Sequence, residues 1–327
     1  MTSQRRATAQ APANIAFIKY WGNRDHRWNL PQNSSLSMNL DGLYAQTTVT
    51  WTDEQPEDTL ILNGEPAAPD ALARVSTHLD ILRSRLNLHA RAAVVSKNNF
   101  PMGAGIASSA AAFAALTVAG ASAAGAELSE RELTTIARIG SGSASRSIPS
   151  GYVEWLAGNS HEESFAESIA APDHWSLVDV IAVVSQDHKR VGSKAGHRSA
   201  DTSDLQAARV SGAESRLAVC RRAVLERDFT TFAKVVELDS NLMHAVMMTS
   251  DPPLFYWLPP TLTIMEAVRG WRADGLHVCY TLDAGANVHC LCERESVDAV
   301  SAALRTISGV VDVRIASAGQ GARLISE

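Results

Sequence analysis

The sequence of 327 residues contains little cysteine and no excess of positive charge. Its four cysteines, at positions 220, 279, 290 and 292, lack the spacing of a zinc site, because the last two are too cramped beside His289 to hold a metal. We therefore expect reduced, mostly buried thiols in a cytoplasmic protein. The net charge of −6 argues against nucleic acid or an acidic membrane as a partner. An anionic ligand must then be bound by local cations.

Signals for secretion or membrane insertion are also lacking. The N-terminal residues MTSQRR are not followed by an apolar h-region, so we expect no signal peptide. Residues 104–126 are numerous enough to span a membrane, but they are mainly Ala, Gly and Ser, which gain little from transfer into lipid. This stretch predicts a close-packed helix inside a folded domain.

Length and composition indicate a globular protein of two domains. Hydrophobic residues make up 46% of the chain and charged residues 20%, as in folded proteins, and 327 residues exceed one compact core. We place an N-terminal domain at 1–186 and a C-terminal domain at 187–327. Helical and extended patterns are interspersed without a steady β-α-β alternation, which predicts an α+β fold.

Apolar runs and their periodicity predict the individual elements. Strands are expected at 11–18, 43–52, 59–62, 90–95, 178–184, 277–282, 288–292 and 310–315, with an Asn63-Gly64 hairpin turn after the third. Helices are expected at 71–86, directly after the glycine loop, from a capping box at 129–132 through 139, and at 205–226, 229–247, 259–274 and 295–307. The polar run 185–203 is interpreted as a loop or a domain junction.

A glycine-rich segment, PMGAGIASSAAA at 101–112, precedes the small-residue helix. A helix N-terminus presents unpaired N–H groups and a positive dipole end, and glycines let a polyanion approach the backbone. The segment is neither a P-loop nor a dinucleotide fingerprint. Taken alone, it is either a phosphate-binding loop or a glycine-capped core helix.

Three further segments carry polar or charged residues in unusual positions. Lys19 ends an apolar strand, so it either faces a cleft or extends along the surface to reach water. Asp283 ends another strand before a small-residue turn, so it is either a turn cap or a free carboxylate. The run GSGSASRS at 140–147 offers backbone donors and the planar fork of Arg146, which suits a carboxylate or phosphate better than a flexible linker.

Together these residues supply a polyphosphate loop, two cations and an isolated carboxylate. Such a set suits ATP-dependent phosphoryl transfer, in which charge is neutralised and a hydroxyl proton is accepted.

The chain resembles the mevalonate diphosphate decarboxylases, a branch of the GHMP small-molecule kinase superfamily. The motifs that carry the resemblance are NIAFIKYWGNRD at 14–25, LPQNSSLS at 30–37, NFP at 99–101, GSGSASRS at 140–147, DTS at 201–203, MH at 243–244 and DAGAN at 283–287. The resemblance implies a two-domain GHMP kinase-like fold, with a ribosomal S5 domain 2-like N-terminal half, a ferredoxin-like C-terminal half and the site between them.

The resemblance also implies a reaction in the mevalonate pathway of isoprenoid biosynthesis. A 5-phosphorylated mevalonate would be phosphorylated on its 3-hydroxyl by ATP with Mg²⁺, and would then lose that phosphate and CO2. The metal would be held mainly by ATP oxygens rather than by protein ligands. The family's habit further implies a homodimer.

The roles of individual residues follow from the same resemblance. Asp283 would be the base or orienter for the 3-hydroxyl, Lys19 would stabilise the charges around it, and Arg146 would grip the carboxylate that is lost. Substrate binding is assigned to Tyr20, Asn23, Arg74, Ser141, Gly142, Ser143, Lys194 and His197. ATP binding is assigned to Gly103, Gly105, Ala107, Ser108, Ser109 and Lys189.

Three positions depart from the family pattern and bear on the substrate. Asn23 stands where the family has a second lysine, Lys194 where arginine is usual, and His197 where an apolar residue is usual. Loss of one cation facing the terminal phosphate costs about 1.5–3 kcal/mol of charge-assisted hydrogen bonding. We therefore expect mevalonate 5-phosphate as substrate and isopentenyl phosphate as product. Mevalonate 5-diphosphate giving isopentenyl diphosphate is the alternative, because Arg74, Lys194 or His197 can replace the missing cation.

Two other functions stay open at this stage. One is a kinase of the same superfamily that stops after phosphorylation, and the other is a non-catalytic binding paralogue. The presence of Lys19, Arg146 and Asp283 disfavours both, since each of these functions dispenses with at least one of them.

Overall fold

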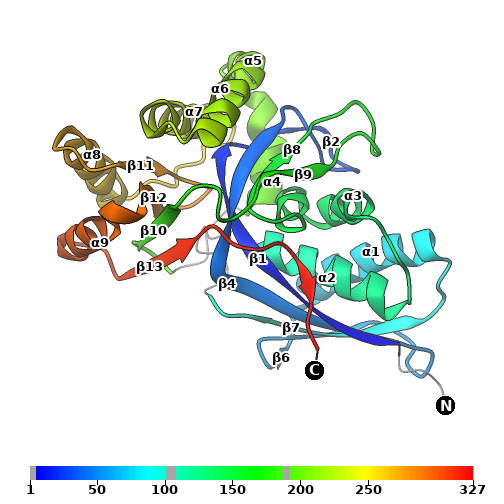
Figure 1. Cartoon of the computed structure of the whole chain (residues 1–327). Coiled ribbons are helices and arrows are strands. Elements are labelled where there is room, and N and C mark those ends of the chain that lie inside the picture. Colours follow the sequence, from blue (N-terminus) through cyan, green and yellow to red (C-terminus); the bar gives the residue numbers. More distant parts are fainter. Residues whose placement is uncertain (1–4, 101–107, 187–191, 327) are drawn as a thin grey trace.

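The computed structural model describes residues 5–100, 108–186 and 192–326, and within them two sheets are flanked by helices (Figure 1). The main path of the first sheet runs β14-β1-β4-β7-β5-β6, and β8 joins the first part of β4 to β9. These strands are β1 (Arg6–Ile18), β4 (Ser35–Thr52), β5 (Thr59–Leu62), β6 (Glu65–Pro66), β7 (Arg91–Asn98), β8 (Tyr152–Trp155), β9 (Ala166–Ala170) and β14 (Arg323–Leu324). A short ribbon of β2 (Asn23–Asp25) and β3 (Leu30–Pro31) follows the end of β1.

Three helices cover one face of the first sheet (Figure 1). They are α1 (Pro69–Leu86), α2 (Ser108–Ala123) and α3 (Glu130–Gly140), and the 3₁₀ segment η1 (Gly142–Ser147) follows α3. The alanine-rich face of α2 lets the sheet approach closely, and the indole N–H of Trp51 donates to the Gly120 carbonyl at 2.9 Å. The close-packed helix predicted from the small residues is confirmed over its described part.

The second sheet has the order β11-β12-β10-β13. Its strands are β10 (Leu177–Val183), β11 (Val278–Thr281), β12 (Val288–Glu293) and β13 (Asp312–Ser317). Its outer face is covered by α8 (Pro259–Ala273) and α9 (Val297–Thr306), the latter preceded by η3 (Arg294–Ser296). The remaining helical segments are α4 (Ser193–Ser199), η2 (Ala200–Thr202), α5 (Gln206–Ser211), α6 (Ala213–Glu226) and α7 (Phe229–Thr249).

One hydrophobic core joins the two sheets. The first half of β1 packs on α2 through Ala9 and Ala11, whereas its second half, including Ile15 and Phe17, packs with α6, α7 and the inner face of the second sheet. Phe17 meets Phe232 of α7 edge to face, with ring centroids 4.9 Å apart. The end of β1 is therefore held rigidly between the two halves of the molecule.

Several local expectations are confirmed. Ser129 and Glu132 form the reciprocal capping box at the start of α3. Asn63 and Gly64 take the positive φ angles of 53° and 92° that a tight hairpin between β5 and β6 requires.

Three local expectations were wrong. The helix expected at 205–226 is broken at Gly212, because the Arg216 guanidinium donates to the Arg209 carbonyl at 2.6 Å, which a continuous helix would use internally. Strand β4 begins at Ser35 rather than 43, since the polar side chains of its first half are buried with partners. The described part of 185–203 contains α4 rather than only a loop.

The sheets do not divide the chain at a single point. Strand β10 precedes residue 186 yet belongs to the second sheet, and β14 returns to the first. The boundary at 186/187 stays a prediction. Within the described ranges no helix is long and apolar enough to cross a membrane.

Candidate active site

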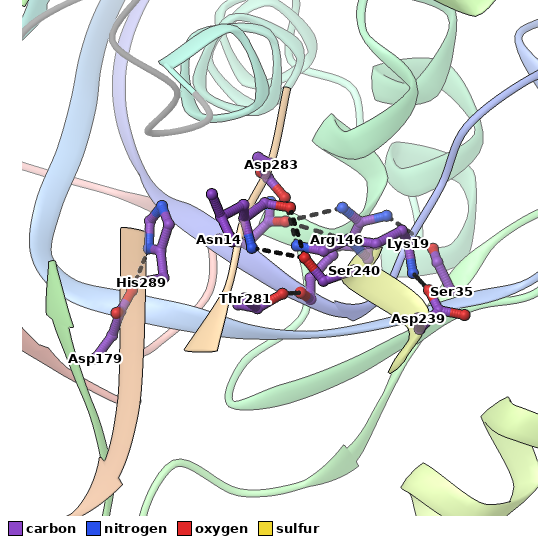
Figure 2. A network of polar contacts seen from close by, with 12 residues as sticks. Asn14, Lys19, Ser35, Arg146, Asp179, Asp239, Ser240, Thr281, Asp283 and His289 are labelled. Atoms are coloured by element: carbon purple, nitrogen blue, oxygen red, sulfur yellow. Dashed lines mark hydrogen bonds and ion pairs between the residues drawn. The ribbon is translucent and has the colours of Figure 1, made fainter. Parts of the chain in front are cut away.

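Lys19 and Asp283 form a buried ion pair where the two halves meet (Figure 2). Lys19 follows the last residue of β1, and Asp283 follows β11 by two residues. Lys19 Nζ donates to Asp283 Oδ1 at 2.8 Å, and the lysine side chain is 1% exposed whereas the carboxylate is 26% exposed. The carboxylate therefore keeps access to solvent while its cationic partner does not. The expectation that Lys19 ends an apolar strand and faces inward is confirmed.

Opposing effects set the protonation of this pair. Burial lowers the pKa of Lys19 below its ordinary value, and the charge of Asp283 counteracts only part of this shift. Burial also disfavours ionisation of Asp283, but the charges of Lys19, His289 and Arg146 outweigh it, so the pKa of Asp283 lies below its ordinary value. Asp283 is therefore ionised at neutral pH and able to accept a hydrogen bond from a ligand.

Arg146 lies beside the pair and is held by neutral groups. Its guanidinium donates to Asn14 Oδ1 at 3.2 and 3.3 Å and to Ser35 Oγ at 2.7 Å. Across the described residues no carboxylate lies within ion-pair distance of it, although it is only 3% exposed. Burial lowers the pKa of Arg146 to about 10, so the group stays cationic. A buried cation with neutral partners favours an anionic ligand.

Four of the residues assigned to substrate form one cluster around the Tyr20 ring. Tyr20 Oη donates to Asn23 Oδ1 at 2.6 Å, and the ring of His197 stacks on that of Tyr20 with centroids 4.1 Å apart. His197 Nδ1 accepts the Gly22 N–H at 3.0 Å. A Cβ added at Gly142 would lie 2.5 Å from the Tyr20 ring, so the glycine permits this contact.

The start of α2 reaches the Ser141 segment. The hydroxyls of Ser109 and Ser141 lie 3.2 Å apart, which joins a residue assigned to ATP with one assigned to substrate. Ser108 is the first residue of α2, and the Ser143 carbonyl accepts from Asn14 Nδ2 at 3.2 Å. The helix start expected to hold phosphates therefore lies next to the predicted substrate segment.

Other predicted site residues lie apart or outside the described structure. Arg74 on α1 stacks over the Phe113 ring at 5.2 Å, and Phe113 packs against Gly140 just before Ser141. Gly103, Gly105, Ala107 and Lys189 lie outside the described residues, and so does the side chain of Lys194 in α4.

Sequence patterns did not reveal the residues that support this site. Asn14 bridges Arg146 and Ser147, donating to Ser147 Oγ at 2.8 Å. A second buried ion pair joins His289 Nδ1 and Asp179 Oδ2 at 2.6 Å (Figure 2). Burial lowers the pKa of His289, but the Asp179 charge outweighs it, so that pKa is raised. The inward position of both residues on paired strands was the available signal, because β10 and β12 otherwise present apolar residues.

Two family models match most of the chain. The model described as the diphosphomevalonate decarboxylase-like N-terminal domain matches residues 11–166, and that of the mevalonate 5-diphosphate decarboxylase C-terminal domain matches residues 179–320. The chain belongs to the mevalonate diphosphate decarboxylase family. The resemblance inferred from the motifs is thereby confirmed.

Similar proteins cover nearly the whole length of this family member. Diphosphomevalonate decarboxylase mvd1 of Aspergillus fumigatus is 40% identical over 93% of this chain and 81% of its own. The diphosphomevalonate decarboxylase of Saccharomyces cerevisiae is 39% identical over 89% of this chain and 79% of its own.

Solved structures of the family have the same fold. The mevalonate diphosphate decarboxylase of Staphylococcus aureus superposes with a TM-score of 0.94 at 34% identity, covering 98% of each chain. A structure described as MDDEF in complex with MVAPP, AMPPCP and magnesium gives 0.93 at 36% identity, covering 98% of this chain and 99% of that one. The α+β, two-domain GHMP-like fold expected from the sequence is confirmed.

Proposed function

We propose that this protein is an ATP-dependent decarboxylase of mevalonate 5-diphosphate, which forms isopentenyl diphosphate in isoprenoid biosynthesis. The observation that carries the proposal is the Lys19–Asp283 ion pair beside Arg146, a buried cation held only by neutral groups among the described residues. A partly exposed carboxylate next to an anion-seeking guanidinium suits a substrate with both a hydroxyl and a carboxylate. The curated relatives, which are diphosphomevalonate decarboxylases, support the same reaction.

The geometry supports a distinct task for each of the three side chains. Asp283 orients the 3-hydroxyl and accepts its proton as the oxygen attacks the γ-phosphorus of ATP. Lys19 stabilises the negative charge that develops around this oxygen. Arg146 binds the substrate carboxylate and keeps it ionised, so that the electrons of the breaking C–C bond form the new double bond as phosphate leaves C3.

The start of α2 suits the phosphates of ATP. Ser108 and Ser109 lie in its first turn, where N–H groups and the positive dipole end favour anions. A related structure is described with AMPPCP and magnesium, which supports ATP and Mg²⁺ as the cofactors here. Mg²⁺ bound to phosphate oxygens would neutralise charge during phosphoryl transfer.

The relatives favour the diphosphate over the monophosphate that the departures at Asn23, Lys194 and His197 led us to expect. One observation still favours mevalonate 5-phosphate as a second candidate. Asn23 is 5% exposed and engaged by Tyr20 and Asn29, so a neutral amide stands where the family has a lysine.

Product analysis with each substrate tests the proposal. Purified protein is incubated with MgATP and either phosphorylated mevalonate, and ADP, phosphate, CO2 and the isopentenyl product are quantified. We expect all four products, with a higher kcat/KM for the diphosphate. A tenfold preference for the monophosphate would establish the second candidate, and ADP without CO2 would establish a kinase.

The assigned roles predict the behaviour of Asp283→Asn. Loss of a general base lowers kcat by about 10²-fold or more, while the isosteric amide preserves the fold. Steady-state kinetics and circular dichroism measure the two effects. Turnover within a few fold of the wild type would refute the role given to Asp283.

Two further properties rest on the family resemblance. We propose a homodimer, which light scattering of the purified protein tests. A cytoplasmic location stays a prediction.

A further inference from the structure

Two neighbouring buried residues of α7 hold the backbone on both sides of the Lys19–Asp283 ion pair. Asp239 Oδ1 accepts the Lys19 N–H at 2.7 Å. Ser240 Oγ accepts the N–H of Leu282, the residue before Asp283, at 3.0 Å. Both side chains are 0% exposed, and Figure 2 shows them beneath the ion pair. One turn of one helix therefore contacts both strand ends that deliver the catalytic groups.

The contact to Lys19 is part of a larger polar network. The second oxygen of Asp239 accepts from Arg216 Nε at 2.7 Å, which compensates the buried carboxylate. On the other side, the Lys19 carbonyl accepts from Asn33 Nδ2 at 3.0 Å. The backbone of Lys19 is thus held at both its N–H and its carbonyl, so its side chain starts from a defined position.

The contact to Leu282 holds the segment that leads to Asp283. Ser240 Oγ also lies 3.5 Å from the Leu282 carbonyl, and Thr281 Oγ1 donates to the Ala16 carbonyl of β1 at 3.3 Å. Strand β1 pairs with β4 and β14, whereas β11 pairs with β12. Since the two strands belong to different sheets, no strand pairing sets the separation of Lys19 and Asp283.

We propose that Asp239 and Ser240 are positioning residues that set the distance between Lys19 and Asp283 for catalysis. The inference rests on the proposed function. It follows from the requirement that reacting groups be aligned closely, since a misplacement of about 1 Å can reduce the rate about 10²-fold. The two residues touch the backbone of the catalytic segments rather than the substrate, so they should affect kcat and leave substrate binding unchanged.

The main test compares Ser240→Ala with Ser250→Ala. Ser250 is a matched control, because its buried hydroxyl also bonds backbone carbonyls, those of Met247 and Pro252, at the end of the same helix. We expect Ser240→Ala to lower kcat about tenfold with both KM values within twofold, and Ser250→Ala to leave kcat within twofold. Equal kcat values for Ser240→Ala, Ser250→Ala and the wild type would overturn the proposal.

A second variant tests the Lys19 side of the contact. Asp239→Asn keeps an acceptor oxygen but presents an amide to Arg216, so we expect a kcat reduction of about tenfold with unchanged KM. If thermal unfolding shows that this variant does not fold, the comparison of Ser240→Ala with its control decides the test, because both of those variants lose only one hydroxyl.

A double-mutant cycle separates positioning from a general loss of stability. If Ser240 acts through Asp283, adding Ser240→Ala to Asp283→Asn should change the residual rate less than twofold. A full tenfold further loss would show that Ser240 acts independently of Asp283 and would contradict the proposal.

A structural readout keeps this test separate from the proposed function. In crystals of Ser240→Ala we expect the Lys19–Asp283 contact to lengthen beyond about 4 Å, the limit of an ion pair, and in Ser250→Ala to persist. An inactive wild type would refute the proposed function while this comparison still tests the positioning. An active wild type with an unchanged ion pair in Ser240→Ala would refute the positioning alone.

Discussion

At the scale of single residues, the site gathers charges that burial alone would disfavour. Asp283 stays ionised because Lys19, His289 and Arg146 outweigh its burial. His289 is in turn held in its charged form by Asp179. Arg146 lacks such a carboxylate among the described residues, so a bound anion would complete it. Each buried charge thus has either a protein partner or a place for a substrate group.

The His289 charge leads to a prediction about pH dependence. His289→Gln removes a cation that lowers the pKa of Asp283, so that pKa should rise. A base with a higher pKa is protonated at a higher pH, and the acid limb of the kcat/KM profile should therefore move to higher pH. The other charged groups near this pair, Lys19, Arg146 and Asp179, are unchanged in the variant.

The matched control for this prediction is His277→Gln. His277 is exposed and pairs with Glu293 rather than with the site, so its replacement should leave the profile unchanged. An acid limb that stays in place in His289→Gln would show that His289 does not influence Asp283.

At the scale of elements, close packing of small residues shapes the substrate side. Segment η1 passes so near the Tyr20 ring that Gly142 has no room for a side chain. The same ring is stacked on His197 and hydrogen-bonded to Asn23. Helix α2 likewise approaches the first sheet through alanines and glycine. Backbone proximity, rather than large side chains, therefore sets the shape of this region.

Gly142→Ala should displace Tyr20 and weaken substrate binding. The added Cβ would lie 2.5 Å from the ring, and overpacking of this kind costs about 1–3 kcal/mol. We expect KM for the phosphorylated mevalonate to rise about tenfold or more, measured by steady-state kinetics. Gly270→Ala in α8 is the control, since nothing lies within 4 Å of its Cβ position, and an equal KM in both variants would contradict the prediction.

At the scale of the whole molecule, the two halves share one core. Strands β1 and β4 of the first sheet, helices α6 and α7, and the inner face of the second sheet all contribute to it. The ion pair lies at this junction, so its geometry depends on both halves being docked. Separate unfolding of the halves would expose this shared apolar surface, which disfavours an intermediate.

Phe17→Ala tests the coupling between the halves. Phe17 is 0% exposed and contacts Phe232 of α7, and loss of a buried phenylalanine costs about 3–5 kcal/mol. We expect a single calorimetric transition in the wild type, and in the variant a single transition at lower temperature. Two transitions in the variant, with only one shifted, would show that the halves unfold independently.

Local sequence signals predicted much of the fold and several site residues. The Ser129 capping box and the Asn63-Gly64 turn formed as expected, because each is decided by hydrogen bonds and φ angles within a few residues. Lys19 and Asp283 were recognised from their places at strand ends. The break at Gly212 was missed, since it depends on where the Arg216 side chain folds back.

Motifs and periodicity in the chain were sufficient to establish the family, most element types and the identity of the charged groups, because these are local properties. Tertiary packing was needed to show that Lys19 meets Asp283 across 264 positions of the chain, that Asn14 and Ser35 hold Arg146, and that Asp239 and Ser240 contact the backbone beside the ion pair. These contacts arise where two sheets and α7 pack on a shared core. Such packing depends on the combined shapes of distant segments, which no local pattern specifies.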